Sequence, residues 1–222
     1  MWKEIISAWK SDNLLAQAWD QSYEMLDISR EMFNESVRVL RTTDNADVNI
    51  DIREKDKIIN KYEQDVRRKV MTHCSIGGTG LVGGMVLTSI VIDIERLGDY
   101  CKNILELVTY HSAKLSVDEV NDALDDVEKH IKYQFDNIID ALKTNDEKKA
   151  RKLMKSYKKG VRRTTDSIVK RLIEGDINAT NSQSATALAL YARYLKRISA
   201  HLSNILSSVV NPFERIGFRE TE

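Results

Sequence analysis

Proline is almost absent from this chain, which has one proline, Pro212, among 222 residues. Proline breaks helix interiors because it lacks a backbone N–H and clashes with the preceding turn, so its absence before residue 212 permits long helices. Aromatic residues are also few, at 7%, whereas charged residues reach 31%, above the usual ~25%. This balance is typical of helical bundles with solvated outer faces.

A net charge is missing as well, because 34 basic and 34 acidic side chains cancel. The whole molecule therefore has no electrostatic reason to bind nucleic acid or acidic lipid. One segment, 148–171, is locally basic, with eleven Lys or Arg and a single acid, Asp166. It lacks interleaved aromatics that would stack on bases, so we expect no nucleic acid partner. A solvated helix face is the favoured interpretation, and peripheral contact with a membrane surface or an acidic partner is the alternative.

Long apolar runs and cysteine motifs are missing too. The longest apolar run covers residues 80–92, which is too short for a membrane span of ~20 residues. Cys74 and Cys101 form neither a metal-ligand spacing nor a disulfide framework, which fits a reducing compartment. The opening residues lack the apolar core of a signal peptide. We therefore expect a cytoplasmic protein.

Helical periodicity is what the sequence does contain. Apolar residues three and four apart line one face of a segment over residues 13–42. The same spacing continues in a second segment over 52–70 and in a third over 90–108. This period is that of an α-helix with one buried face. The first half of the chain is therefore predicted to form three long helices.

Three more helices are predicted in the second half. Ser116 and Glu119 have the spacing of a capping box that would open a fourth helix. Thr144 and Glu147 have the same spacing and would open a fifth. A sixth is expected over 182–210.

The two halves are similar to each other in sequence. At a shift of 102 residues the turn at 40–44 meets the turn at 142–146, and the apolar positions of the second helix meet those of the fifth. At a shift of 101, Arg96 meets Arg197 and Asn103 meets Asn204. The predicted organisation is listed from the N-terminus: a short helix over 1–12 with two tryptophans on one face, a first repeat over 13–112, a second repeat over 116–210, and a tail over 211–222.

Helix three carries a motif, Glu95-Arg-Leu-Gly-Asp99 followed by Asn103-Ile104, that resembles the hallmark of the phosphate-uptake regulator (PhoU) family. The second copy, at 192–205, is similar to the same family stretch with three positions changed. Together with the repeat, the resemblance extends over about residues 13–210. It implies an all-α fold of two tandem three-helix bundles, and a regulatory protein and not an enzyme.

The resemblance also implies partners. An adaptor of this family would restrain phosphate uptake or phosphate-responsive signalling by contacting a transporter ATPase or a sensor kinase, and would form a homodimer. Two alternatives are a helical scaffold without ligand and a carboxylate-bridged metal protein. The second class uses Glu-x-x-His motifs, which none of the four histidines completes. The G-x-G-x-x-G match at 78–83 lacks the preceding strand of a dinucleotide site, so nucleotide binding is rejected.

The motif places Glu95 and Asp99 one helical turn apart, with their carboxylates only ~5–6 Å from each other. Like charges this close require protons or a cation. The resemblance implies that such pairs, on two helices of each repeat, bind metal. The candidate ligands of Fe, Mn, Mg or Ca in the first repeat are Glu95, Asp99, Asp56, Asn60, Glu63 and Asp93. The alternative is a solvated acidic patch neutralised by Arg96 and nearby lysines.

The second repeat departs from this pattern. Lys158, Arg162, Lys196 and Ala200 stand at the positions that correspond to Asp56, Asn60, Glu95 and Asp99. Three cations and an alanine do not hold a hard cation, so no metal is expected there. We hypothesise that these fixed charges replace the metal electrostatically or bind an anion.

Overall fold

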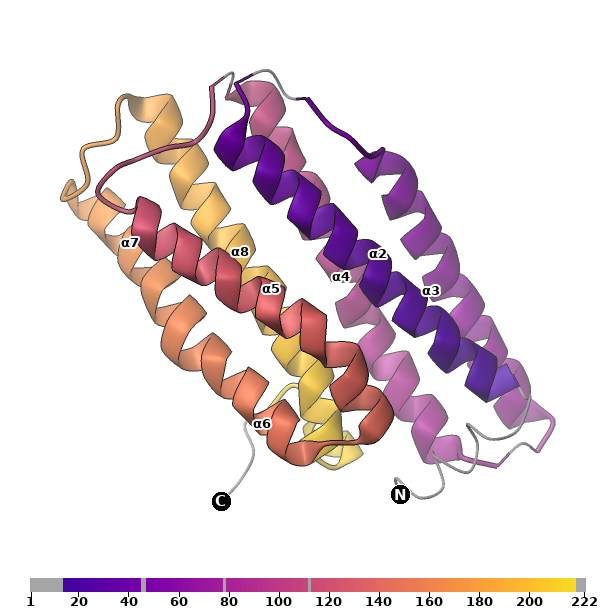
Figure 1. The fold of residues 1–222 in the computed structure, drawn as a ribbon. Helices are drawn as coiled ribbons and strands as arrows, with labels where there is room; N and C mark the ends of the chain where they lie inside the picture. The colour runs from indigo at the N-terminus through magenta and orange to yellow at the C-terminus, as the bar shows by residue number, and fades with distance from the viewer. Residues whose placement is uncertain (1–13, 45–46, 78, 112, 219–222) are drawn as a thin grey trace.

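Helices make up all the regular structure in the described part of the chain, which in the computed structural model comprises residues 14–44, 47–77, 79–111 and 113–218. Figure 1 shows two sets of long, roughly antiparallel helices lying against each other. In chain order the elements are α2 (Leu14–Thr42), α3 (Ile52–Ser75), α4 (Leu81–Tyr110), α5 (Asn121–Thr144), α6 (Glu147–Ser156), a π-helical segment (Tyr157–Arg162), α7 (Arg163–Glu174), α8 (Ser182–Val210) and a short 3-10 helix (Phe213–Arg215). The helix expected over 1–12 lies outside the described residues.

Each half forms a three-helix bundle. Helices α2, α3 and α4 pack together in the first, and α5, the α6–α7 run and α8 pack together in the second (Figure 1). The all-α fold of two tandem bundles is therefore confirmed. Among the described helices, none is long and apolar enough to cross a membrane.

The apolar stripes predicted from periodicity face the core. In α2 and α3 the buried stripe includes Trp19, Phe33 and Ile59, and in α4 it includes Ile94 and Leu97. Burying such side chains contributes about 1.5–3 kcal/mol each. The periodicity of these helices therefore identified their buried faces correctly.

One hydrophobic core joins the two bundles. The rings of Phe33 on α2 and Phe135 on α5 lie 5.4 Å apart between centroids. A polar contact also joins α2 to α5: Arg41 Nε lies 3.1 Å from Glu128 Oε1, and the buried Tyr191 hydroxyl donates to Glu128 at 2.7 Å. Burial raises the pKa of Glu128. The two repeats are therefore in direct, partly charged contact.

Both capping-box predictions are wrong. Helix α5 begins at Asn121, not near Ser116, because Ser116 accepts a hydrogen bond from Asn121 and Glu119 accepts one from the backbone of Asn178. The next helix is capped by Asp146, whose carboxylate accepts from Lys149 N at 2.9 Å. The Thr144 hydroxyl instead donates to the Asp140 carbonyl within α5.

The fifth predicted helix is helical throughout but is not uniformly α. Residues 157–162 form a π-helical segment between α6 and α7. Gly160 lies in this segment, where an added Cβ would be 3.2 Å from the ring of His130 on α5. The absence of a side chain therefore permits the wider π turn to approach α5 closely.

Gly98, the glycine of the motif, allows α3 and α4 to pack closely. A Cβ at Gly98 would lie 3.0 Å from Ile59 Cδ1 and 3.7 Å from Asp56 Oδ1. The first contact is tighter than ordinary van der Waals separation. This close approach brings the acidic residues of the two helices onto a common surface.

We predict that Gly98→Val lowers the free energy of unfolding by about 1–3 kcal/mol, because the added carbons overpack the contact with Ile59. The control is Met85→Val, which introduces the same side chain on an exposed part of α4 and should change stability by about 0.5 kcal/mol or less. Urea unfolding of both variants measures the effect. Equal stabilities for the two variants would contradict the proposed role of Gly98.

Candidate functional site

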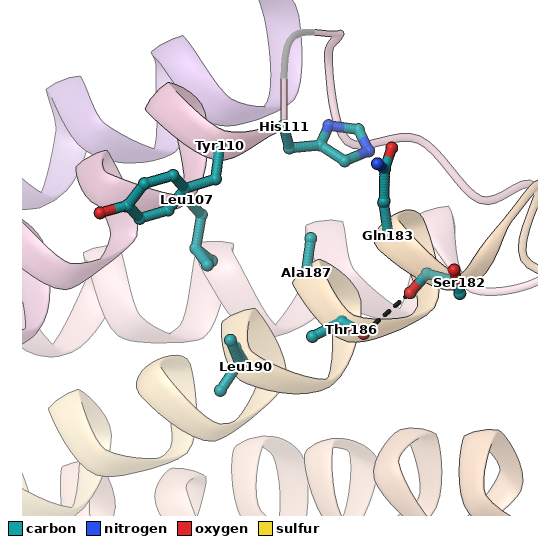
Figure 2. A pocket seen from close by; sticks show the side chains of 8 residues that line it. All are labelled: Leu107, Tyr110, His111, Ser182, Gln183, Thr186, Ala187 and Leu190. Carbon is teal, nitrogen blue, oxygen red and sulfur yellow. Dashed lines mark hydrogen bonds between the residues drawn. The ribbon is translucent and has the colours of Figure 1, made fainter.

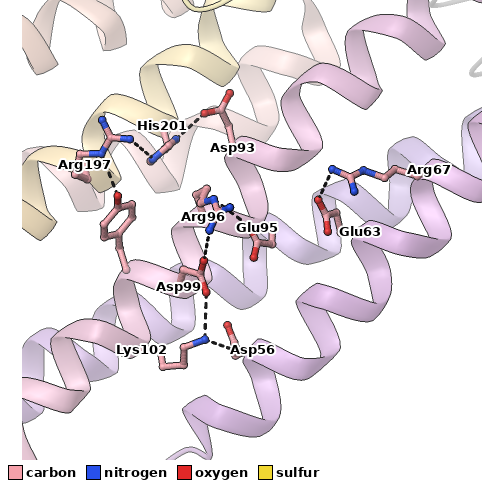
Figure 3. A network of polar contacts seen from close by, with 11 residues as sticks. Asp56, Glu63, Arg67, Asp93, Glu95, Arg96, Asp99, Lys102, Arg197 and His201 are labelled. Carbon is pink, nitrogen blue, oxygen red and sulfur yellow. Dashed lines mark hydrogen bonds and ion pairs between the residues drawn. The ribbon is translucent and has the colours of Figure 1, made fainter.

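An acidic cluster lies between α3 and α4 on the first bundle. Asp56 and Glu63 project from α3, and Glu95 and Asp99 project from α4, as Figure 3 shows. We call these four residues the acidic cluster. All six predicted ligands lie on these two packed helices, and four of them form the acidic cluster.

Lys102 occupies the bridging position within the acidic cluster. Its ammonium lies 2.8 Å from Asp56 Oδ2 and 3.1 Å from Asp99 Oδ1, and so connects α3 to α4. Burial lowers the pKa of Lys102, but the hydrogen bonds to the two carboxylates outweigh that effect and the pKa is raised. Arg96 holds the other oxygen of Asp99 at 2.7 Å. From the sequence we predicted Arg96 as a neutralising partner of these acids and did not predict Lys102. Lys102 nevertheless follows Asp99 at the i+3 spacing of a helical ion pair.

Glu95 is the least neutralised acid of the cluster. Burial raises its pKa to about 6, and the charges of Asp99, Glu63 and Asp56 act in the same direction. Arg96 opposes them from 3.5 Å, outside hydrogen-bond distance. The Glu95 carboxylate is therefore poised to take up a proton or a cation.

The remaining predicted ligands differ in their surroundings. Glu63 pairs with Arg67 at 2.8 Å on the same helix, and its charge reaches Glu95. Asn60 is partly buried on α3, one turn beyond Asp56. Glu63 therefore contributes charge within the acidic cluster, whereas Asn60 follows Asp56 on the same helix and adds no charge.

Asp93 is not part of the acidic cluster. Its carboxylate contacts α8 of the second bundle, with Oδ1 2.6 Å from His201 Nδ1 and 3.2 Å from Asn204 Nδ2 (Figure 3). Sequence proximity to Glu95 suggested a shared site, but residues two apart on a helix face different directions. The structure therefore assigns Asp93 to the contact between the bundles.

The donor chemistry of the cluster suits a hard cation, since Asp56, Glu95 and Asp99 offer carboxylate oxygens. Lys102 competes for the same oxygens. In the conformation described, no three acidic, histidine or cysteine side chains of the described residues are arranged to hold a metal ion. Metal binding here stays a prediction, and a bound cation would have to displace the Lys102 ammonium.

The second repeat places a cation between the corresponding helices. Lys196 on α8 forms an ion pair with Asp166 on α7. Arg162 approaches the other oxygen of Asp166 at 3.7 Å. An ammonium thus connects helices two and three in both repeats, although Lys102 and Lys196 are not at equivalent positions.

A separate apolar hollow of about 320 Å³ lies between the end of α4 and the start of α8 (Figure 2). It is lined by Leu107, Tyr110 and Leu190 among others. His111 at its edge lies 3.1 Å from the Ser184 hydroxyl through Nε2. This hollow shares no residue with the acidic cluster.

Comparisons with known proteins agree with the duplicated fold. A family model described as the PhoU domain matches residues 23–108 and again residues 124–209. Among solved structures, PhoU from Pseudomonas aeruginosa superposes with a TM-score of 0.77 at 18% identity, covering 89% of this chain and 95% of that one. The phosphate transport system regulatory protein PhoU from Streptococcus pneumoniae gives a TM-score of 0.75 at 15% identity, covering 88% and 93%. No curated protein sequence matches the chain.

Sequence identities of 18% and 15% show only that the fold is shared. The family model, by contrast, is matched to the amino-acid sequence. Its two matches together span more than half of the chain and fall within the repeats expected at 13–112 and 116–210. The first match contains the Glu95 to Asp99 motif with its helix-packing glycine, and the second contains the altered copy. The chain therefore belongs to the PhoU domain family.

Proposed function

We propose that this protein is a cytoplasmic, non-catalytic regulator of phosphate transport that acts by contact with other proteins. The observation that carries the proposal is the match of two PhoU domains in tandem. The similar Streptococcus pneumoniae protein is described as a phosphate transport system regulatory protein. The partner would be a phosphate transporter ATPase or a sensor kinase, and the regulator itself would be a homodimer.

The turn between α3 and α4 offers an apolar contact surface. Four large apolar side chains around this turn are exposed: Met71, Ile76, Leu81 and Met85. We call them the apolar tip. Ile76 is 74% exposed and Leu81 is 59% exposed, although burying either would be favourable. Clustered exposed apolar residues mark protein interaction sites, which supports partner docking at this end of the first bundle.

The basic face of the α6–α7 run is a second candidate surface. Lys155, Lys158, Lys159 and Arg163 are exposed on it. Other cations of the run are already engaged, such as Lys149 with Asp140 and Arg151 with Glu147. An acidic partner or an anionic membrane surface would complement this face. We assign it a steering role secondary to the apolar tip, since exposed charges add more to encounter rate than to affinity.

We further propose that the acidic cluster can bind a divalent cation, with Fe, Mn, Mg and Ca as candidates. Asp56, Glu95 and Asp99 would hold the ion. A bound cation would supply the positive charge that Glu95 lacks and would join α3 to α4. Burial is the first cause of the raised pKa of Glu95, and the charges of Asp99, Glu63 and Asp56 add to it. A cation beside Glu95 would offset the repulsion from these carboxylates, which supports this proposal.

We predict that Lys102→Gln makes the metal-free protein less stable by about 1–3 kcal/mol, since Asp56 and Asp99 lose their shared partner. Mn²⁺ should then raise the thermal midpoint of the variant more than that of the wild type, because the competing ammonium is gone. Thermal unfolding with and without Mn²⁺ measures both effects. Lys129→Gln, which removes an exposed lysine paired with Asp126, is the control. An equal Mn²⁺ response in wild type and Lys102→Gln would argue against a metal site.

We predict that Glu95→Gln stabilises the protein near pH 7.5 by about 1 kcal/mol, after allowance for solvent screening. The pKa of Glu95 rises from 4.5 to about 6 on folding, so the folded state holds this proton more tightly than the unfolded chain. The free energy of unfolding therefore falls as pH rises through this interval, and glutamine removes that loss. At pH 4 the two proteins should be equally stable. Urea unfolding at both pH values tests this, with Glu106→Gln on the same helix as control.

We predict that Leu81→Asp weakens binding to the transporter ATPase or the sensor kinase by about tenfold or more, because a charge would be buried in the contact. Ile173→Asp is the control, since Ile173 is exposed on the second bundle and should leave binding unchanged. Titration calorimetry with each purified partner, across phosphate and metal conditions, measures the affinities. Light scattering shows whether the same variant alters a homodimer. Absence of binding to both partners under all conditions would refute the proposed function.

A further inference from the structure

A polar hollow of about 450 Å³ lies where the two repeats meet. Its walls come from the end of α2, the linker before α5 and the first half of α5. This volume is within the ~300–1,000 Å³ of small-molecule sites. We call it the junction hollow. Its charged lining residues are Arg38, Arg41, Lys114, Lys132, Asp125 and Glu128.

The two acids of the junction hollow share one lining cation, Arg41. Arg41 lies 3.0 Å from Asp125 Oδ1 through Nη2 and 3.1 Å from Glu128 Oε1 through Nε. The Tyr191 hydroxyl also donates to Glu128. These carboxylates are therefore poor ligands for a metal cation. The four cations of the lining outnumber its two acids, but Glu35 outside the lining pairs with Arg38, so the excess is one positive charge.

Lys114 and Lys132 are the two lining cations available to a ligand. Neither side chain forms an ion pair with an acid of the described residues. Lys132 is exposed on α5, and its charge reaches Glu128. Arg38, by contrast, is fixed by Glu35, which accepts from Nε at 2.9 Å and from Nη2 at 2.8 Å. The hollow thus combines two uncommitted ammonium groups with an oriented guanidinium.

The backbone around Lys114 is held in place. Lys114 N donates to Asp44 Oδ1 at 3.0 Å, and Leu115 N donates to the Leu40 carbonyl at 2.8 Å. Both bonds fasten the linker to the end of α2. The Ser116 hydroxyl in the same wall accepts from Asn121 Nδ2 at 2.9 Å, so its own O–H is a donor. The backbone of this wall is therefore fixed before any ligand arrives, which lowers the entropy cost of binding.

We propose that the junction hollow binds a phosphate dianion through Lys114, Lys132 and Arg38. The ammonium groups of Lys114 and Lys132 complement the negative charge of the ligand, and phosphoryl oxygens accept the charge-assisted hydrogen bonds that these side chains offer. The phosphate group belongs either to inorganic phosphate or to a nucleotide. A ligand here touches α2, the linker and α5 together, so its binding strengthens the contact between the repeats. This inference goes beyond the proposed function and does not depend on it.

Titration calorimetry of the full chain with inorganic phosphate and with ATP, at constant ionic strength, tests the site. Lys114→Gln and Lys132→Gln should each weaken binding about tenfold, because a hydrogen bond to a charged group is worth ~1.5–3 kcal/mol. Lys129→Gln is the matched control: Lys129 lies on the same helix but does not line the hollow, and its affinity should stay within about twofold of wild type. Urea midpoints confirm that the variants fold.

The titration results distinguish a phosphate site from nonspecific attraction, and inorganic phosphate from a nucleotide. Saturable binding of phosphate that the two variants weaken supports the proposal with inorganic phosphate as ligand. Saturable binding of ATP alone, weakened in the same way, supports it with a nucleotide as the source. Absence of saturable binding by both probes overturns the proposal. Equal weakening by Lys129→Gln also overturns it, because that result indicates nonspecific attraction to the basic surface.

Discussion

The close packing of α3 on α4 at Gly98 is the constraint on which the acidic cluster depends. With no Cβ between the helices, Asp56 on one helix approaches Asp99 on the other closely enough for a single ammonium, that of Lys102, to bind both. The same approach partly buries Glu95 among three other acids, and burial, followed by their charges, raises its pKa. Packing and electrostatics are coupled here, since a larger residue at position 98 would separate the carboxylates that the motif provides.

The two repeats use different residues to compensate the charges between their second and third helices. In the first repeat, helices two and three present acidic residues on a common face. In the second repeat, the corresponding positions are Lys158, Arg162 and Lys196. In both, a lysine pairs with an aspartate of the neighbouring helix, Asp56 in one case and Asp166 in the other. Partly buried charges must be compensated wherever they arise. The duplicated fold therefore tolerates loss of the motif when the replacement charges find partners of their own.

The junction between the bundles combines apolar and charged contacts. Phe33 and Phe135 supply its apolar centre, while Arg41 with Glu128 and Asp93 with His201 supply polar contacts on α2–α5 and α4–α8 respectively. Breaking a buried ion pair by removing one partner costs far more than an exposed pair is worth. Such contacts specify how one bundle lies against the other. They also make the junction a natural place for a charged ligand to act.

The sequence by itself determined the helices, their buried faces, the duplication and the family, because a repeat of 3.6 residues is set by local geometry and is visible in any amphipathic helix. It also identified Glu95, Asp99 and Asp56 as neighbours, since the motif places two of them one turn apart. Tertiary structure alone decided that Lys102 bridges the cluster, that Asp93 turns to His201 of the other repeat, and that Asp146 and not Thr144 caps its helix. Each of these contacts depends on which side chains of different helices, turns or repeats lie within bonding distance in the folded chain. Residue spacing along the sequence does not determine those distances.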